Sequence, residues 1–170
     1  VWTIPAERSK NGKAHRVPLS AMALALIKEA MALATKPDPT DDAEAKTPEW
    51  LFPSPRGDGS IGPESVNSTL RRALLPSSKN ARPVIELENF VPHDLRRTSA
   101  SNMTALGINR LTVAKILNHT DGSVTGVYDR YSYDAEKRHA LDSWAAHLEG
   151  LLTGEPPAAN VVPMAVASEA

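Results

Sequence analysis

The chain contains 14 prolines, whose positions mark where helices and strands cannot continue. They gather at residues 37–55 and 156–163, so these stretches are predicted to be loop and tail. Regular structure therefore has to form in the segments between them. A single globular domain fits this division, because 170 residues with 41% hydrophobic content suffice for one core of ordinary size.

Two short extended runs near the N-terminus, Trp2–Ile4 and residues 16–19, flank the sequence Ser9-Lys10-Asn11-Gly12-Lys13. Asn-Gly between two extended runs is a strong hairpin signal because both residues tolerate a positive φ. The sequence therefore predicts a β-hairpin with a basic tip.

Helices are predicted where apolar residues recur at helical spacing beside capping residues. Ser20, Asn109 and Asp134 are the expected N-caps, and Pro63 suits the first turn of another helix. The expected helices cover residues 21–35, 63–74, 93–103, 110–117, a short segment after residue 123, and residues 134–151.

These elements predict an α+β fold that is mainly α, with a helical core and a small antiparallel sheet built from the hairpin. Residues 1–153 are expected to form the domain, and residues 154–170 a disordered C-terminal tail. The helix after Ser20 is expected to lie in the core. The helix at residues 110–117 is expected to pack through Leu111, Ala114 and Leu117.

The net charge of −1 hides a segregation of charges along the chain. Residues 7–16 hold four cations against one acid, residues 71–82 hold four cations and no acid, and acids gather at residues 38–49. We therefore predict a basic face that meets phosphates and an acidic back. The expected phosphate contacts are Lys13, Arg16, Arg71, Arg72 and Arg97, although an exposed lysine such as Lys13 is more often simply solvated.

The chain has no cysteine, which excludes disulfides and thiolate metal sites, and no apolar run long enough to span a membrane. A cytoplasmic location is expected. The first residues, Val1-Trp2-Thr3-Ile4-Pro5, lack an initiating Met and the features of a signal peptide, so we expect an excised fragment of a longer protein.

Chemistry is carried by an ordered set of residues: Lys10, then His93-x-x-Arg96, then His119, then Tyr128. Phosphodiester transfer by an enzyme-borne nucleophile needs a hydroxyl, cations around the non-bridging oxygens and an acid for the leaving oxygen. Each residue alone is a weak signal, but together they supply all three requirements.

The motifs His93-Asp94-Leu95-Arg96-Arg97-Thr98, Leu117-Asn118-His119 and Val127-Tyr128 resemble the H-x-L-R-[RH]-T, L-[GS]-H and tyrosine pattern of the tyrosine recombinases, or phage-type integrases. The Glu7-Arg8-Ser9-Lys10-Asn11-Gly12 segment is similarly like the hairpin of prophage integrases that carries a catalytic lysine. The resemblance covers roughly residues 1–150.

This resemblance implies a role for each matching residue. Tyr128 would be the nucleophile that forms a 3′-phosphotyrosyl link, and Arg96 would stabilise the pentacoordinate phosphate. Lys10 would protonate the leaving 5′-oxygen, His93 would act in proton transfer on the tyrosine, and His119 would hydrogen-bond a non-bridging oxygen. No metal or other cofactor is implied.

The resemblance also implies partners. These are double-stranded DNA attachment sites, a homo-tetramer on DNA in the full-length protein, and accessory directionality or bending proteins, in a bacterial, nucleoid-associated setting. The segment after the tyrosine, residues 140–151, would dock either on a neighbouring protomer or on its own domain.

Two departures from the family pattern stand out. The family's first catalytic arginine precedes the Trp-x-Ile-Pro strand, and nothing precedes Val1 here, so the fragment alone is expected to be inactive. Position 118 is Asn where Gly or Ser is usual, a mild change because a helix C-terminus accepts Asn in the left-handed region.

Several alternatives remain open. Tyr131 is the second choice of nucleophile and Tyr133 the third. The region from residue 99 to residue 117 reads as helix, turn, helix, so a non-catalytic DNA-binding module is possible, with Asn109, Arg110 and Thr112 as base-reading residues. An inactive truncated remnant is a further alternative, and a type IB topoisomerase shares the chemistry but not the prophage-like hairpin.

Overall fold

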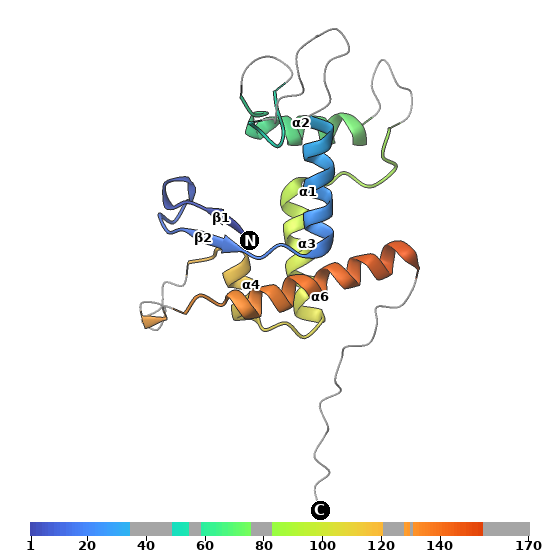
Figure 1. Ribbon diagram of the computed structural model, residues 1–170. Coiled ribbons are helices and arrows are strands. Elements are labelled where there is room, and N and C mark those ends of the chain that lie inside the picture. The colour runs from blue at the N-terminus through green and yellow to red at the C-terminus, as the bar shows by residue number, and fades with distance from the viewer. Residues whose placement is uncertain (35–48, 55–58, 76–82, 121–127, 130, 155–170) are drawn as a thin grey trace, which may run out of the picture. The chain divides into compact units, whose positions relative to one another are not determined.

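The computed structural model describes residues 1–34, 49–54, 59–75, 83–120, 128–129 and 131–154. Within these ranges the chain has five α-helices and one two-stranded antiparallel sheet (Figure 1), which confirms the predicted α+β, mainly α class. It divides into two compact units, Val1–Ser20 with Met103–Ala170, and Ala21–Asn102. The expected tail beyond residue 154 and the helix expected after residue 123 fall largely outside the described residues.

The sheet of the first unit confirms the predicted hairpin. Strand β1 (Trp2–Ile4) pairs with β2 (His15–Val17) in the register Trp2↔Val17, and the short 3-10 helix η1 (Ala6–Arg8) follows β1. Of the Asn-Gly pair at the tip only Gly12 has a positive φ, of 66°, and its amide donates to Ser9 O at 3.0 Å.

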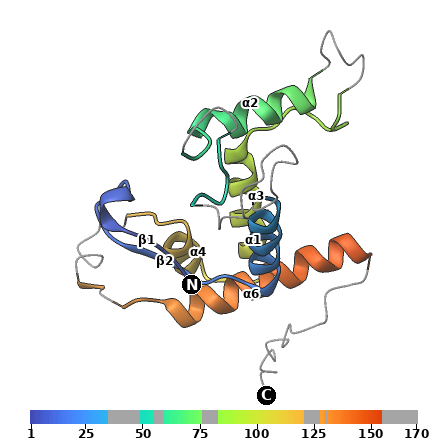
Figure 2. The same ribbon diagram turned by 45° about the horizontal axis from the view of Figure 1, so that its top comes forward.

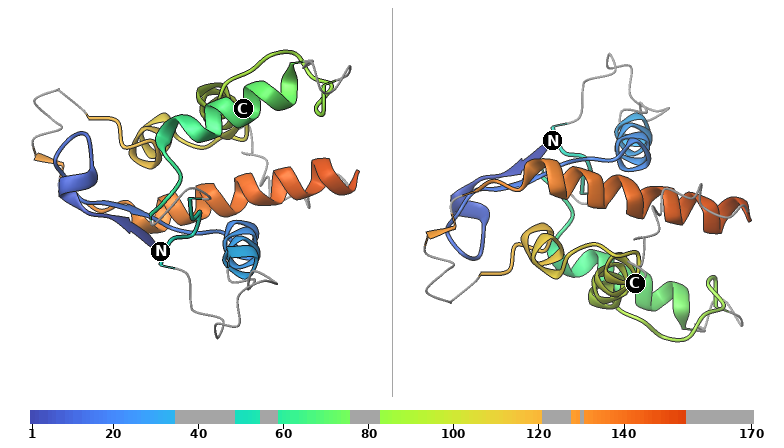
Figure 3. Two further views of the ribbon diagram at one scale, coloured as in Figure 1. Left: turned by 90° about the horizontal axis from the view of Figure 1, so that it is seen from above. Right: turned by 90° about the horizontal axis from the view of Figure 1, so that it is seen from below.

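The described part of this unit also contains helices α4 (Arg110–Ile116) and α6 (Asp134–Thr153) and the last residues of α3 (Pro92–Ala105). The Asn109 side chain accepts a hydrogen bond from the Leu111 amide at 2.8 Å, which confirms it as the N-cap of α4. Helix α6 packs against α4 and β2. Figures 2 and 3 show that α4 and β2 lie beside the N-terminal half of α6. Met103, 2% exposed, and Ala140, 0% exposed, are the most buried apolar residues here.

Two local predictions in this unit are wrong. Leu111 is exposed, whereas Ala114 and Leu117 are half-buried and the fully buried residues of α4 are Thr112 and Val113. Asp134 does not cap α6. Tyr133 occupies the N-cap with a positive φ of 54°, and the Asp134 carboxylate is used in ion pairs.

The second unit contains α1 (Ala21–Ala34), α2 (Pro63–Leu74) and most of α3 (Pro92–Ala105). Pro63 opens α2 as predicted, and Leu74 is buried at its end. Helix α1 forms directly after Ser20, but none of its residues is buried, so the expectation of a core helix is wrong. Its large apolar residues are spread too widely for one buried face, and Leu24, Leu26, Met31 and Leu33 are exposed.

The burial of Ala140 predicts that Ala140→Leu destabilises the fold, by about 1–3 kcal/mol, because the added side chain has no space. Ala146→Leu, at an exposed position of the same helix, should change stability by less than about 0.5 kcal/mol. Urea unfolding of both variants measures the difference. Equal midpoints for the two variants would contradict the packing of α6 described above.

Candidate functional site

The hairpin tip is joined to the end of α4 by three side chains. The Ser9 hydroxyl donates to Asn11 Oδ1 at 2.9 Å, and Asn11 Nδ2 donates to Asn118 Oδ1 at 2.9 Å. Asn118 Nδ2 donates back to Ser9 Oγ at 3.0 Å, which closes the cycle. We call these three side chains the tip ring. Because Lys10 lies between Ser9 and Asn11 and His119 follows Asn118, the ring brings together the chain segments that carry both residues.

Helix α4 ends in a Schellman motif, and this motif places His119. Asn118 has a positive φ of 56°, its amide donates to Lys115 O at 3.3 Å, and the His119 amide donates to Ala114 O at 3.0 Å. Asn118 thus has the left-handed conformation expected of it. His119 is exposed directly after the turn.

His15 forms a second connection between the hairpin and α4. Its ring is buried, and Nε2 donates to the Ile116 carbonyl at 3.1 Å. A two-stranded sheet with three residues in each strand has little stability of its own. These contacts with α4 therefore fix the position of the hairpin.

A groove of about 560 Å³ lies between the hairpin, the end of α4 and the segment before α6. Three predicted site residues, Lys13, Arg16 and His119, line it. The other lining residues come from the same three segments and from the first turn of α6: Asn11, Ala14, His15, Lys115, Asn118, Thr120, Asp129, Tyr131, Ser132, Asp134 and Lys137.

Part of the positive charge in the groove is compensated by Asp134. Arg16 Nε lies 2.9 Å from Asp134 Oδ2, and the Lys137 ammonium lies 2.9 Å from Asp134 Oδ1. Lys137, which is 5% exposed, also donates to the Arg16 carbonyl at 2.8 Å. Hydrogen bonds from Lys137 and Arg16 hold the pKa of Asp134 below its usual value. Arg16 therefore helps to attach β2 to α6, a role that the sequence did not indicate.

The three neighbouring tyrosines differ in their surroundings. Tyr128 is 80% exposed. The Tyr133 hydroxyl donates to Asp129 at 3.0 Å, and this bond raises the pKa of Tyr133. The charge of Glu136 raises the pKa of Tyr131, whose ring packs edge-on against Tyr133 with 4.9 Å between centroids. Tyr131 and Tyr133 are thus held in contacts with each other and with Asp129.

The residue that follows Tyr128 is held by a lysine of α4. The Lys115 ammonium lies 2.7 Å from Asp129 Oδ2 and 4.8 Å from the centre of the Tyr133 ring. The hydrogen bond from Lys115 is the main cause that lowers the pKa of Asp129. This contact fixes the backbone next to Tyr128 relative to α4, the helix that precedes His119.

His93 and Arg96 lie in the second unit, near the start of α3. Both are exposed, and their spacing of three residues puts them on one side of the helix. Between them, Asp94 accepts a hydrogen bond from the Val91 amide at 3.1 Å and lies 3.6 Å from Arg97. Asp94 therefore organises the start of the helix and compensates part of the charge of Arg97.

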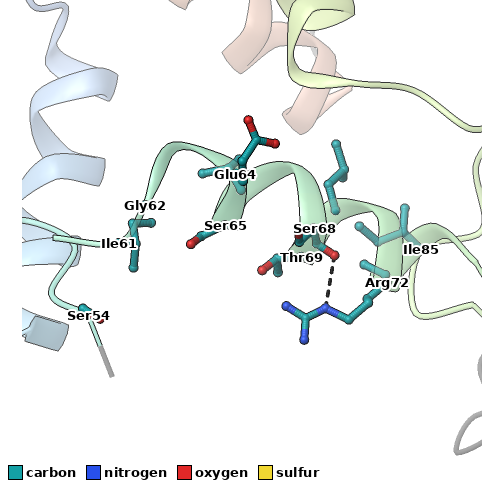
Figure 4. A pocket seen from close by; sticks show the side chains of 12 residues that line it. Ser54, Ile61, Gly62, Glu64, Ser65, Ser68, Thr69, Arg72 and Ile85 are labelled. Atoms are coloured by element: carbon teal, nitrogen blue, oxygen red, sulfur yellow. Dashed lines mark hydrogen bonds between the residues drawn. The ribbon is translucent and has the colours of Figure 1, made fainter. Parts of the chain in front are cut away.

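The predicted contacts Arg71 and Arg72 are exposed on the last turn of α2. A cavity of about 870 Å³ lies along this helix, and its lining includes Ser65, Thr69 and Arg72 as well as Glu64. In Figure 4 the Glu64 side chain lies on the opposite side of the helix from these three. Arg72 Nε donates to the Ser68 carbonyl at 3.1 Å, which holds the guanidinium close to the helix. This unit therefore presents hydroxyl and guanidinium groups together, a combination that suits phosphate oxygens.

The predicted residues are thus divided between the two units. Lys10, Lys13, Arg16, His119 and Tyr128 belong to the first, and Arg71, Arg72, His93, Arg96 and Arg97 to the second. Convergence of all five catalytic candidates on one phosphate stays a prediction. Sequence reasoning missed the supporting residues Asn11, His15, Lys115, Asp129 and Lys137. The sequence offered two weak signals of these supporting contacts: the unusual Asn at position 118 and the charged residues next to the motifs.

The regulator-like alternative is weakened by the surroundings of α4. Thr112 is buried, and the Asn109 side chain is used as an N-cap. Of the three residues expected to read bases, only Arg110 is both exposed and outside these roles. A recognition helix needs several such side chains at its start.

A mainly helical fold with a basic hairpin and an exposed tyrosine is the arrangement expected of a tyrosine recombinase. Residues 1–135 match the Phage integrase family, and the chain belongs to this family. No solved structure matches it significantly. In the part of the chain that the structure describes, no helix combines the length and apolar character needed to cross a bilayer.

Curated relatives agree with this assignment at modest identity. Prophage integrase IntA of Escherichia coli K12 is 27% identical over 85% of this chain and 30% of its own length. Tyrosine recombinase XerD of Rhizobium meliloti is 31% identical over 71% of this chain and 35% of its own length. XerD of Caulobacter vibrioides is 27% identical over 71% of this chain and 37% of its own length. The chain therefore spans about a third of the length of these relatives.

The contact between Lys115 and Asp129 predicts a pH-dependent effect. Because Lys115 lowers the pKa of Asp129, their pairing stabilises the fold above the ordinary carboxyl pKa of 3.8 and is lost as the pH falls through the lowered value. Lys115→Met should raise the Asp129 midpoint in an NMR titration of the carboxyl carbons. Lys13→Met removes a charge from the same groove and should move this midpoint less. Equal shifts in both variants would contradict a specific pair.

Proposed function

We propose that this chain contributes the nucleophile and phosphate-binding residues of a site-specific recombinase that cleaves and rejoins double-stranded DNA through Tyr128. The observation that carries the proposal is that Tyr128 is exposed while Asp129, the next residue, is held by Lys115. Asp129 lines the same groove as His119 and Lys13, while the Tyr133 hydroxyl is engaged by Asp129 and the Tyr131 ring packs against Tyr133.

In the proposed reaction the Tyr128 oxygen attacks the scissile phosphorus while its proton passes to His93. The bond between phosphorus and the 5′-oxygen breaks, and Lys10 supplies a proton to that oxygen. Arg96 and His119 would stabilise the negative charge on the non-bridging oxygens. The products are a 3′-phosphotyrosyl enzyme and a 5′-hydroxyl end, and attack by another 5′-hydroxyl reverses these steps without ATP.

The similarity to prophage integrase IntA supports a role in integrating or excising a mobile element. We propose that residues 1–153 belong to the catalytic domain of such an enzyme, which works as a homo-tetramer on DNA attachment sites in the bacterial nucleoid. Accessory directionality or bending proteins belong to the same proposal. The expected arginine ahead of Val1 would complete the phosphate site, so functional assays should use the polypeptide as its gene encodes it.

The nucleophile can be tested with a suicide DNA substrate that is nicked close to the scissile phosphate. Tyr128→Phe should abolish the covalent protein–DNA adduct, while Tyr131→Phe and Tyr133→Phe should retain it. Arg96→Ala should slow adduct formation by about a hundredfold or more, because it removes charge stabilisation in the transition state. An adduct that persists in Tyr128→Phe at the wild-type rate would refute this assignment.

The ion pair of Arg16 predicts that Lys13 and Arg16 differ in how they contribute to DNA binding. Lys13→Ala should reduce the salt dependence of DNA affinity by about one phosphate contact. Arg16→Ala should reduce it less, because Asp134 already compensates this guanidinium. Binding measured over a series of salt concentrations gives both slopes. A larger loss of slope in Arg16→Ala than in Lys13→Ala would contradict this division.

A further inference from the structure

We infer that Asn118 is a positioning residue for Lys10, acting through the tip ring. The inference rests on the proposed function, in which Lys10 is the acid for the leaving 5′-oxygen. Asn118 itself would touch neither the DNA nor the reacting atoms. Its role is to connect the fixed end of α4 to the two residues on either side of Lys10.

The three hydrogen bonds of the ring run in one direction, from Ser9 to Asn11, from Asn11 to Asn118 and from Asn118 back to Ser9. Each of Ser9, Asn11 and Asn118 both donates and accepts within the cycle. Asn11 Oδ1 also accepts from the Lys13 amide at 3.1 Å, so the backbone on both sides of Gly12 is supported. The two bonds made by Asn118 are part-buried and join segments 107 and 109 residues apart in sequence. They are therefore tertiary contacts and not local turn chemistry.

Asparagine meets two requirements at position 118. The backbone there has a φ of 56°, which glycine and asparagine accept at low cost. The ring also needs an acceptor and a donor on one side chain, which glycine lacks and aspartate supplies only in part. An asparagine in place of the family's usual Gly adds this connection and keeps the left-handed turn, which asparagine accepts at lower cost than the alternative Ser.

The ring is expected to affect Lys10 more than His119. The His119 amide is held by Ala114 O through the Schellman motif, and this bond uses no side chain of the ring. Lys10 is exposed on the hairpin tip and has a flexible side chain, so its placement depends on how firmly the tip is held. Holding Ser9 and Asn11 reduces the positions that the Lys10 ammonium can sample, which favours proton transfer.

The variant that isolates this effect is Asn118→Gly, because glycine keeps the turn and removes both ring contacts. The full-length protein is assayed for single-turnover cleavage on two suicide substrates. One has the natural 5′-oxygen at the scissile position and the other has a bridging 5′-sulfur. A thiolate leaves without protonation far more readily than an alkoxide, so the sulfur substrate needs no general acid.

With the oxygen substrate, Asn118→Gly and Ser9→Ala should each slow cleavage by about tenfold, and the double variant by no more than either alone. With the sulfur substrate all three should cleave within about twofold of wild type. Lys10→Ala should show the same pattern with a loss of about a hundredfold or more on oxygen. Asn109→Ala, which removes the N-cap at the other end of α4, is the control for lost stability and should slow both substrates equally or neither.

The contradicting results are equally specific. Equal slowing on both substrates in Asn118→Gly would show a general structural role and overturn the inference, as would wild-type rates on the oxygen substrate. If Lys10→Ala cleaved the sulfur substrate as slowly as the oxygen substrate, Lys10 would not be the general acid. The inference would then be overturned, because the ring would have no acid to position. A wild-type protein that forms no adduct with either substrate would overturn the proposed function and this inference together.

Discussion

The attachment of the N-terminal hairpin to the end of α4 is the contact on which the first unit depends. The hairpin strands have three residues each, too few to be stable alone. The tip ring and the bond from His15 to Ile116 connect them to a segment more than 100 residues later in the chain. This connection forms one wall of the groove and determines where Lys13 and His119 lie relative to each other. Arg16 and Lys137 add a second attachment of the hairpin, from β2 to the start of α6.

Charge pairing separates the cations that support the fold from those assigned to the proposed DNA contacts. Asp134 holds Arg16 and Lys137 where β2 meets α6, and Asp129 holds Lys115 beside Tyr133. Lys10 and Lys13 remain exposed at the hairpin tip, and Arg71 and Arg72 at the end of α2. The net charge of −1 is therefore compatible with the proposed DNA-acting role, because Asp134 and Asp129 compensate the cations that connect structural elements.

Local signals in the sequence predicted the elements well, but not the contacts between them. The hairpin, the Pro63 start and the Asn109 cap follow from the residues next to each element, and all three were confirmed. The buried face of α4 and the use of Asp134 depend on α6, which is distant in sequence, so periodicity and capping rules gave the wrong answer there. The hydrogen-bond partners of Asn118 could not be predicted because they too are distant in sequence. The sequence showed only that Asn replaces the usual Gly or Ser at this position. The catalytic roles came from the motif resemblance and remain predictions.

Mass spectrometry of the covalent adduct tests the central claim most directly, because trypsin separates the candidate tyrosines. Cleavage after Lys115 and Arg130 releases residues 116–130 with Tyr128 as their only tyrosine, and cleavage after Lys137 releases residues 131–137 with Tyr131 and Tyr133. Adduct trapped on a suicide substrate, digested with nuclease and trypsin, should carry the nucleotide remnant on the peptide of residues 116–130. A remnant on residues 131–137 would contradict the assignment of Tyr128.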